Sequence, residues 1–106
     1  RAFIYQLSKR LADANTEMGL RSDNTTNFPI FNYYLKDSDQ INDVAEYLFN
    51  KGIYVTLAPY PMVAKNDVGF RVQLTAANTM EEVEYLIRTI KELTQIFGIQ
   101  SNSTTN

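Results

Sequence analysis

One arginine stands out in this sequence because it lies inside an otherwise uncharged run. Apolar residues alternate around Arg71, at Phe70, Val72 and Leu74. A period of two is typical of a half-buried strand, so Arg71 is predicted to project from the opposite face of that strand. A guanidinium held on a rigid strand forms a planar fork that suits a carboxylate or a phosphate. We therefore interpret Arg71 as a candidate anion-binding residue.

A second group of candidates precedes this strand. Pro59 and Pro61 stiffen a short segment whose other members include Tyr60, Met62 and Val63. The two prolines prevent this segment from continuing as an interior strand, so it is predicted to form a loop close to the arginine strand. A soft methionine beside a tyrosine suits contact with a flexible apolar chain. Tyr60, Met62 and Val63 are thus candidates for the wall of a binding site.

The elements that position these residues follow from local patterns. Apolar residues spaced three and four apart predict a helix over residues 2–18, closed by Gly19. Residues 30–35 form an aromatic and β-branched run after a proline, which predicts a strand. Asp37 and Gln40 have the spacing of a capping box, and the apolar stripe behind them predicts a second helix that Gly52 ends.

The second half of the chain contributes two strands and a helix. Residues 53–57 predict a short strand, and turn residues before the arginine strand predict that the two pair as an antiparallel hairpin with a wide loop. Thr79 and Glu82 form a capping box that opens a final helix, with Gly98 as its stop. Residues 1–98 are therefore predicted to be one domain, and residues 99–106 a flexible tail.

This order, α-β-α-β-β-α, predicts an α+β fold. We expect a two-layer sandwich, with a three-stranded, mainly antiparallel sheet and helices on one of its faces. One layer of helices covers only one face of a sheet. The other face, which holds Arg71, is left for solvent, a ligand or another domain.

Composition excludes several functional classes. A net charge of −2 and a pI near 5.0 argue against nucleic acid or an anionic membrane as a partner, since both require clustered basic residues. The sequence has no cysteine, which is typical of a cytoplasmic protein, and no histidine, the commonest general base and metal ligand. Because the chain starts inside a predicted helix, we expect it to be part of a longer polypeptide.

Several motifs, taken in their order along the chain, resemble a known family. They are a strand opened by Pro29-Ile30, a helix ending in residues 50–55, a Pro-x-x-Val type loop at 59–64, and Phe70-Arg71-Val72 followed by residues 75–83. In this order they resemble the C-terminal small domain of the α-oxoamine synthases. These pyridoxal-phosphate enzymes have the aspartate-aminotransferase fold (fold type I). They include 8-amino-7-oxononanoate synthase, 2-amino-3-ketobutyrate CoA ligase and serine palmitoyltransferase. The chain departs from the family pattern at two places. Asn78 stands where the family usually has histidine, and Ala64-Lys65 stands where the family usually has a second proline soon after the loop valine.

The resemblance implies an enzymatic function for the parent polypeptide. Such enzymes condense a small amino acid with an acyl-CoA, and usually act as homodimers in the cytoplasm. By resemblance, Arg71 binds the carboxylate of the amino acid, while Tyr60, Met62 and Val63 belong to the loop at the substrate entrance. Pyridoxal 5′-phosphate needs a Schiff-base lysine, and none of the lysines here has the family's Ser/Thr-x-x-Lys context. The resemblance therefore implies that a large domain of the same polypeptide binds the cofactor and that this fragment alone is inactive.

The main alternative belongs to a different functional class, and a third option is a purely structural domain of a degenerate enzyme. A similar order of helices and strands occurs in free-standing regulatory domains of the ACT or ferredoxin-like type, which bind small ligands. Such a domain could bind an amino acid at a subunit interface. The parent gene separates the two hypotheses, since only the enzyme requires a preceding domain with a pyridoxal-phosphate site.

Overall fold

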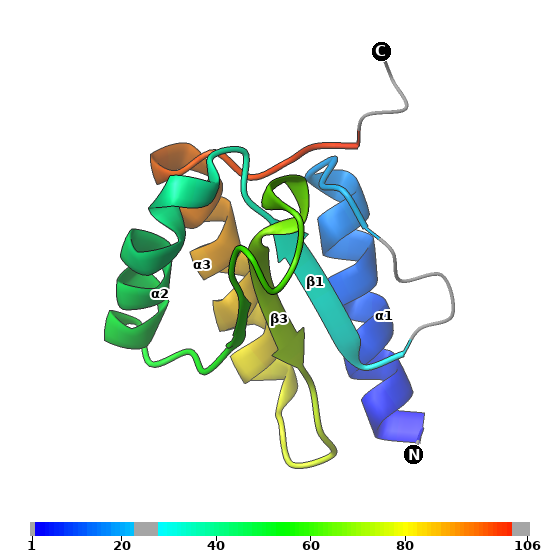
Figure 1. Ribbon diagram of the computed structural model, residues 1–106. Coiled ribbons are helices and arrows are strands. Elements are labelled where there is room, and N and C mark those ends of the chain that lie inside the picture. Colours follow the sequence, from blue (N-terminus) through cyan, green and yellow to red (C-terminus); the bar gives the residue numbers. More distant parts are fainter. Residues whose placement is uncertain (1, 23–27, 103–106) are drawn as a thin grey trace.

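The computed structural model describes residues 2–22 and 28–102. Within them the helices and strands follow the predicted order (Figure 1). They are α1 (Ala2–Glu17), β1 (Ile30–Tyr34), α2 (Ile41–Asn50), β2 (Thr56–Ala58), β3 (Gly69–Gln73) and α3 (Met80–Ile96). Two short 3-10 turns, η1 (Ser38–Gln40) and η2 (Lys65–Asp67), precede α2 and β3.

The three strands form one antiparallel sheet in the order β1-β3-β2. Since β3 runs antiparallel to both neighbours, β1 and β2 are parallel to each other and separated by β3. This arrangement is a split β-α-β unit. The three helices lie on the same side of the sheet (Figure 1). The coarse prediction of an α+β domain with a three-stranded antiparallel sheet is confirmed.

The core lies between the sheet and the helices. Its sheet side includes Tyr33 and Phe70, whose rings stack with their centroids 5.1 Å apart. The helices contribute the apolar stripes expected from their periodicity, namely Leu7, Leu11, Val44, Leu48, Val83, Ile90 and Leu93, all at most 1% exposed. The hydroxyl of Tyr33 is also buried and donates a hydrogen bond to Asn15 Oδ1 at 2.9 Å. This bond satisfies the polar end of an otherwise apolar contact.

Two predicted boundaries were wrong, for local reasons. The strand expected at residues 53–57 is β2, at Thr56–Ala58. Gly52 has a positive φ of 77°, and the Ile53 N–H bonds back to Leu48 O, so the chain is still closing α2 at residue 53. The side chain of Asp37 accepts from the N–H of Asp39. It therefore caps η1 instead of forming a capping box with Gln40, and α2 starts at Ile41.

The predicted start of a flexible tail at residue 99 was also wrong. Ile99 is buried and forms a bridge with Leu35 at the end of β1. The N–H of Gln100 bonds to Tyr34 O at 2.7 Å, and Ser101 bridges Leu20. The outer edge of β1 has backbone groups that need partners, and this segment supplies them. The domain therefore extends to residue 102, while residues 103–106 lie outside the described residues.

The two ends of α3 are formed in different ways. Thr79 and Glu82 form the predicted capping box at the start of α3, with both reciprocal hydrogen bonds present. At the other end, α3 finishes at Ile96 because Phe97 is already extended. Gly98, expected as the stop, follows this break and accepts a hydrogen bond from the Lys36 N–H. No helix within the described residues is long and apolar enough to cross a membrane.

Candidate anion site on the open sheet face

The central strand positions Arg71 as predicted. Phe70 and Val72 point into the core, so Arg71 between them projects from the opposite face and is exposed. We call this face, formed by Ile30, Asn32, Tyr34, Arg71 and Gln73, the open face. Arg71 lies between Asn32 of β1 and Thr56 of β2 in the strand register. It therefore occupies the middle of the sheet.

Arg71 has a neutral partner. Its Nε–H donates to Asn32 Oδ1 at 3.2 Å. The ion pairs found among the described residues involve Lys9, Arg10, Arg21 and Lys51, and none involves Arg71. The Nη atoms of Arg71 carry four further N–H donors. The charge of the guanidinium is thus not compensated by a neighbouring carboxylate in the described part of the chain.

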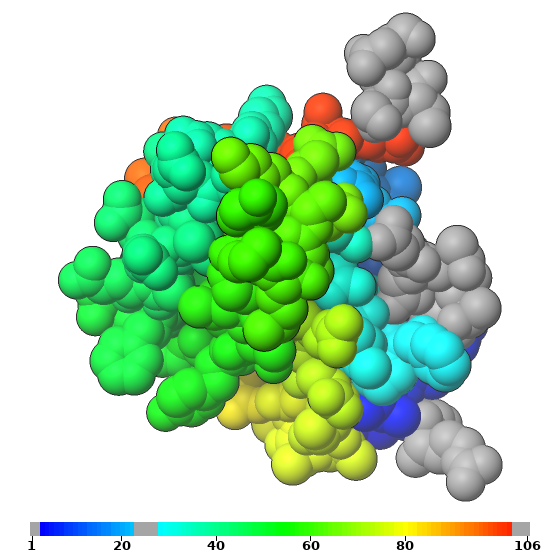
Figure 2. All heavy atoms as spheres, in the orientation of Figure 1, coloured from blue at the N-terminus to red at the C-terminus, as the bar shows by residue number. Residues whose placement is uncertain are grey.

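A hollow of about 310 Å³ lies beside Arg71 on the open face. It is lined by Arg21, which follows α1, and by residues of β1, β3, the end of β2 and the segment that follows β2, among them Asn32, Tyr34, Val63, Asp67 and Arg71. Figure 2 shows the segment around residue 60, in green, lying over part of this face. The hollow is thus bounded by the sheet on one side and by this loop on another.

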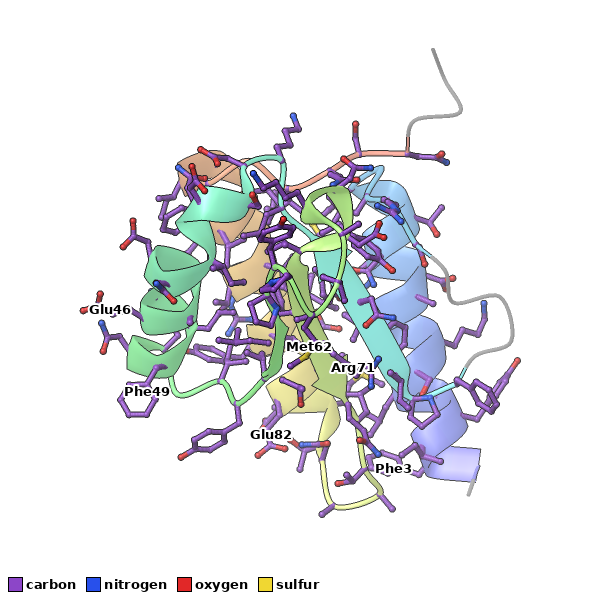
Figure 3. All side chains as sticks on the ribbon, in the orientation of Figure 1. Phe3, Glu46, Phe49, Met62, Arg71 and Glu82 are labelled. Atoms are coloured by element: carbon purple, nitrogen blue, oxygen red, sulfur yellow. The ribbon has the colours of Figure 1, made fainter. Side chains whose placement is uncertain are left out.

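The predicted entrance loop, residues 59–64, is brought to the site only in part. Val63 lines the hollow together with Arg71 and also packs against the core. Tyr60 and Met62 do not line it and are 56% and 77% exposed. Figure 3 shows Met62 and Arg71 in the same region, in front of the strands. The Lys65 ammonium lies 5.1 Å from the centre of the Tyr60 ring. The loop therefore presents two apolar side chains outward beside the site.

A second arginine in the hollow was not predicted. The guanidinium of Arg21 lies 3.7 Å from the centre of the Tyr34 ring and makes an ion pair with Asp67 at 3.1 Å. It also donates to Gln100 Oε1 at 2.9 Å. These partners are 13 to 79 residues away along the chain, so no local pattern could indicate them. Arg21 joins β1, η2 and the C-terminal segment, and its charge is already paired.

The turn after β3 is held by Asn78, which stands out in the sequence only as a departure from the family pattern. Asn78 Oδ1 accepts from the Thr75 N–H at 2.8 Å, and Asn78 Nδ2 donates to Glu82 Oε1 at 3.1 Å. The hydrogen bond from Asn78, and then that from the Thr79 backbone, lower the pKa of Glu82. Asn78 therefore serves the geometry of this turn, and Glu82 serves the helix cap.

The described residues do not fit pyridoxal phosphate. Lys9, Lys36, Lys65 and Lys91 are exposed, and Lys51 is half-exposed and paired with Glu92. A Schiff-base lysine needs an enclosed position beside groups for the ring and the phosphate. The described residues also contain no group of three or more acidic, histidine or cysteine side chains that could hold a metal ion. The site offers an arginine fork and a loop.

The comparisons with known proteins leave the family open. No protein-family model matches the sequence, and no curated protein matches it either.

Proposed function

We propose that this chain is the C-terminal small domain of a pyridoxal-phosphate-dependent α-oxoamine synthase, in which Arg71 binds the carboxylate of the amino-acid substrate. The parent enzyme condenses a small amino acid with an acyl-CoA and functions as a homodimer. The cofactor would supply an electron sink for this chemistry. In this proposal, another part of the parent polypeptide binds it.

The observation that carries the proposal is the state of Arg71. A cation on the central strand, with a neutral hydrogen-bond partner and no carboxylate beside it among the described residues, is ready to bind an external anion. The fork binds a carboxylate through two parallel hydrogen bonds, which fix its orientation as well as its position. In an enzyme this orientation selects which bond to the α-carbon is aligned for reaction.

The surroundings of Arg71 suit a cover from a second domain. Ile30 on the open face is 36% exposed. Together with the exposed Tyr60 and Met62 of the loop, it places apolar side chains on the side of the sheet that carries Arg71. Removing such a site from water would strengthen its interaction with a substrate carboxylate. In the proposal, the large domain of the same polypeptide supplies this cover.

Substitution of Arg71 in the full-length enzyme tests the proposal. Removing a hydrogen-bonded charged partner costs about 1.5–3 kcal/mol, so Arg71→Ala is expected to raise the amino-acid KM roughly tenfold or more. Arg71→Lys is expected to recover little, because a point charge does not replace a planar fork. The control is Arg88→Ala on the exposed side of α3, where the guanidinium lies 5.8 Å from the Tyr85 ring centre. Unchanged amino-acid kinetics in both Arg71 variants would overturn the proposal.

One observation favours the alternative function, a small-ligand sensor of the ACT or ferredoxin-like type. The split β-α-β arrangement, with residues 99–100 pairing beside β1, matches the strand order of that class. This argument is an analogy of fold. Calorimetric titration of the 106-residue chain with amino acids separates the two functions. One exposed ion pair contributes only ~1 kcal/mol, so the enzyme proposal expects no measurable binding. Submillimolar binding would support the sensor.

A further inference from the structure

The side chain opposite Arg71 has a defined place in the sheet. The Leu35 N–H bonds to Val68 O at 2.8 Å, and the Leu74 N–H bonds to Pro29 O at 2.7 Å. Hydrogen-bonded and non-hydrogen-bonded pairs alternate along an antiparallel ladder. The pair Asn32–Arg71 is three positions from each of these hydrogen-bonded pairs, so it is non-hydrogen-bonded. Side chains approach most closely at such pairs, which have Cα atoms roughly 4.5 Å apart.

The contact between these two side chains occupies one edge of the guanidinium. A carboxylate binds an arginine either along the side that carries Nε and one Nη, or across the end formed by both Nη atoms. The Nε–H is already donated to Asn32 Oδ1 at 3.2 Å. Only the end formed by the two Nη atoms is then left for a carboxylate. The amide of Asn32 is neutral, so it holds the guanidinium without compensating its charge.

We propose that Asn32 is a positioning residue, which holds Arg71 so that the end of its fork faces an incoming carboxylate. This inference rests on the proposed function, because it specifies how the same site receives its substrate. Asn32 is half-buried between its strand neighbours, which restricts its side chain more than that of a fully exposed residue. Aspartate has the same shape as asparagine but would form an ion pair with Arg71 and compete with the substrate.

Three substitutions in the full-length enzyme test this role. Asn32→Asp is expected to raise the amino-acid KM more than tenfold, and Asn32→Ala about threefold, since it frees the guanidinium without neutralising it. The KM for acyl-CoA is expected to change less than twofold in both. Gln73→Glu is the matched control, because it adds the same charge to the open face, opposite Ile30 in the register. It is expected to raise the amino-acid KM less than threefold, since solvent and salt screen an exposed charge.

Two results would overturn the positioning role while leaving the proposed function intact. One is equal amino-acid KM values for Asn32→Asp and Gln73→Glu. The other is an unchanged KM for Asn32→Ala although Arg71→Ala is impaired. An unchanged KM for Arg71→Ala itself would overturn both proposals.

A second measurement on the 106-residue chain tests the contact directly. The Nε–H resonance of Arg71 is expected to shift in Asn32→Ala and to stay in place in Gln73→Ala. A resonance that is insensitive to Asn32 would mean that the contact does not hold Arg71 in solution, and the inference would fail.

Discussion

The two faces of the sheet differ in how their polar groups find partners. On the face that the helices cover, the Tyr33 hydroxyl is buried and bonds to the buried side chain of Asn15. On the open face, Arg71 donates one hydrogen bond to Asn32 and remains exposed. A buried polar group must be satisfied inside the protein for the fold to be stable, whereas an exposed one is free to exchange water for a ligand. The covered face is thus committed to stability, and the open face is available for binding.

The two arginines of the hollow make the same contrast within one face. Arg21 contacts the Tyr34 ring, makes an ion pair with Asp67 and donates a hydrogen bond to Gln100, so it joins three segments of the chain. Among the described residues, Arg71 donates a side-chain hydrogen bond to the neutral Asn32 and makes no ion pair. An arginine with its charge paired serves the structure, and one without such a pair is the better candidate for a ligand. Four substitutions test which residues of the two faces contribute to stability. They follow in order of their expected effect on the free energy of unfolding.

The largest loss is expected where β3 and β1 approach most closely. A Cβ atom added at Gly69 would lie 1.8 Å from the backbone oxygen of Tyr33. A backbone atom cannot move aside as a side chain can, so Gly69→Ala is expected to lower the free energy of unfolding by about 3 kcal/mol or more. Denaturant titration measures this change. In the control, Gly98→Ala, the three atoms nearest the new Cβ belong to the Lys36 side chain, at 3.0 to 3.3 Å, and the loss should stay below about 1 kcal/mol. Equal losses would contradict the close approach.

The covered face is tested by removing one hydroxyl. Tyr33→Phe leaves the Asn15 side chain buried without this partner, and is expected to lower the free energy of unfolding by about 1–3 kcal/mol. Tyr54→Phe, at a position that is 85% exposed, is the control and should be neutral within about 0.5 kcal/mol. A neutral Tyr33→Phe would mean that the hydroxyl contributes nothing to the covered face.

Tyr33 also makes the stability of the fold depend on pH in the alkaline range. Burial raises the pKa of Tyr33 above the ordinary value of 10.0. Above pH 10 the unfolded chain therefore loses the tyrosine proton while the folded chain retains it, so stability is expected to fall as the pH rises. Unfolding curves recorded from pH 8 upward should fall less steeply for Tyr33→Phe than for the wild type. Parallel curves would contradict the buried, neutral phenol.

Arg21→Ala tests the structural arginine. Its ion pair with Asp67 is only partly buried, and its ring contact is worth a similar amount, so a loss of about 1 kcal/mol is expected. Arg88→Ala, at an exposed position on α3, should change stability by less than about 0.5 kcal/mol. A neutral Arg21→Ala would remove the distinction between the two arginines of the hollow.

The smallest effect on stability is expected for Arg71→Ala. Its side-chain hydrogen bond to Asn32 is exposed and joins it to a neutral group, so the free energy of unfolding should change by less than about 0.5 kcal/mol. Thermal and denaturant unfolding measure this change beside that of Arg21→Ala. A loss as large as that of Arg21→Ala would place Arg71 among the structural residues and weaken the proposed function.

Much of the fold and part of the site could be predicted from local patterns. The alternation around Arg71 placed it on the open face, and the spacing of Thr79 and Glu82 placed the start of α3. Both are properties of a few consecutive residues. One prediction failed because it required knowledge of a remote neighbour: the flexible tail was expected to start at Ile99, but Ile99 is held by Leu35, which is far away in the sequence. Of the three predicted loop residues, Val63 reaches the hollow, because the path of the loop depends on what it packs against.

The sequence by itself determined which residues alternate, which cap a helix and which carry charge, because these depend on backbone geometry within one or two turns. Only the tertiary structure decided that Asn32 lies opposite Arg71, across 39 residues, and that Asp67 is paired with Arg21, across 46. Strand register and the docking of loops depend on the simultaneous packing of the whole core. The sequence therefore shows where each arginine lies and which strand or loop carries it. Whether the charge of that arginine is paired with a carboxylate depends on the assembled fold.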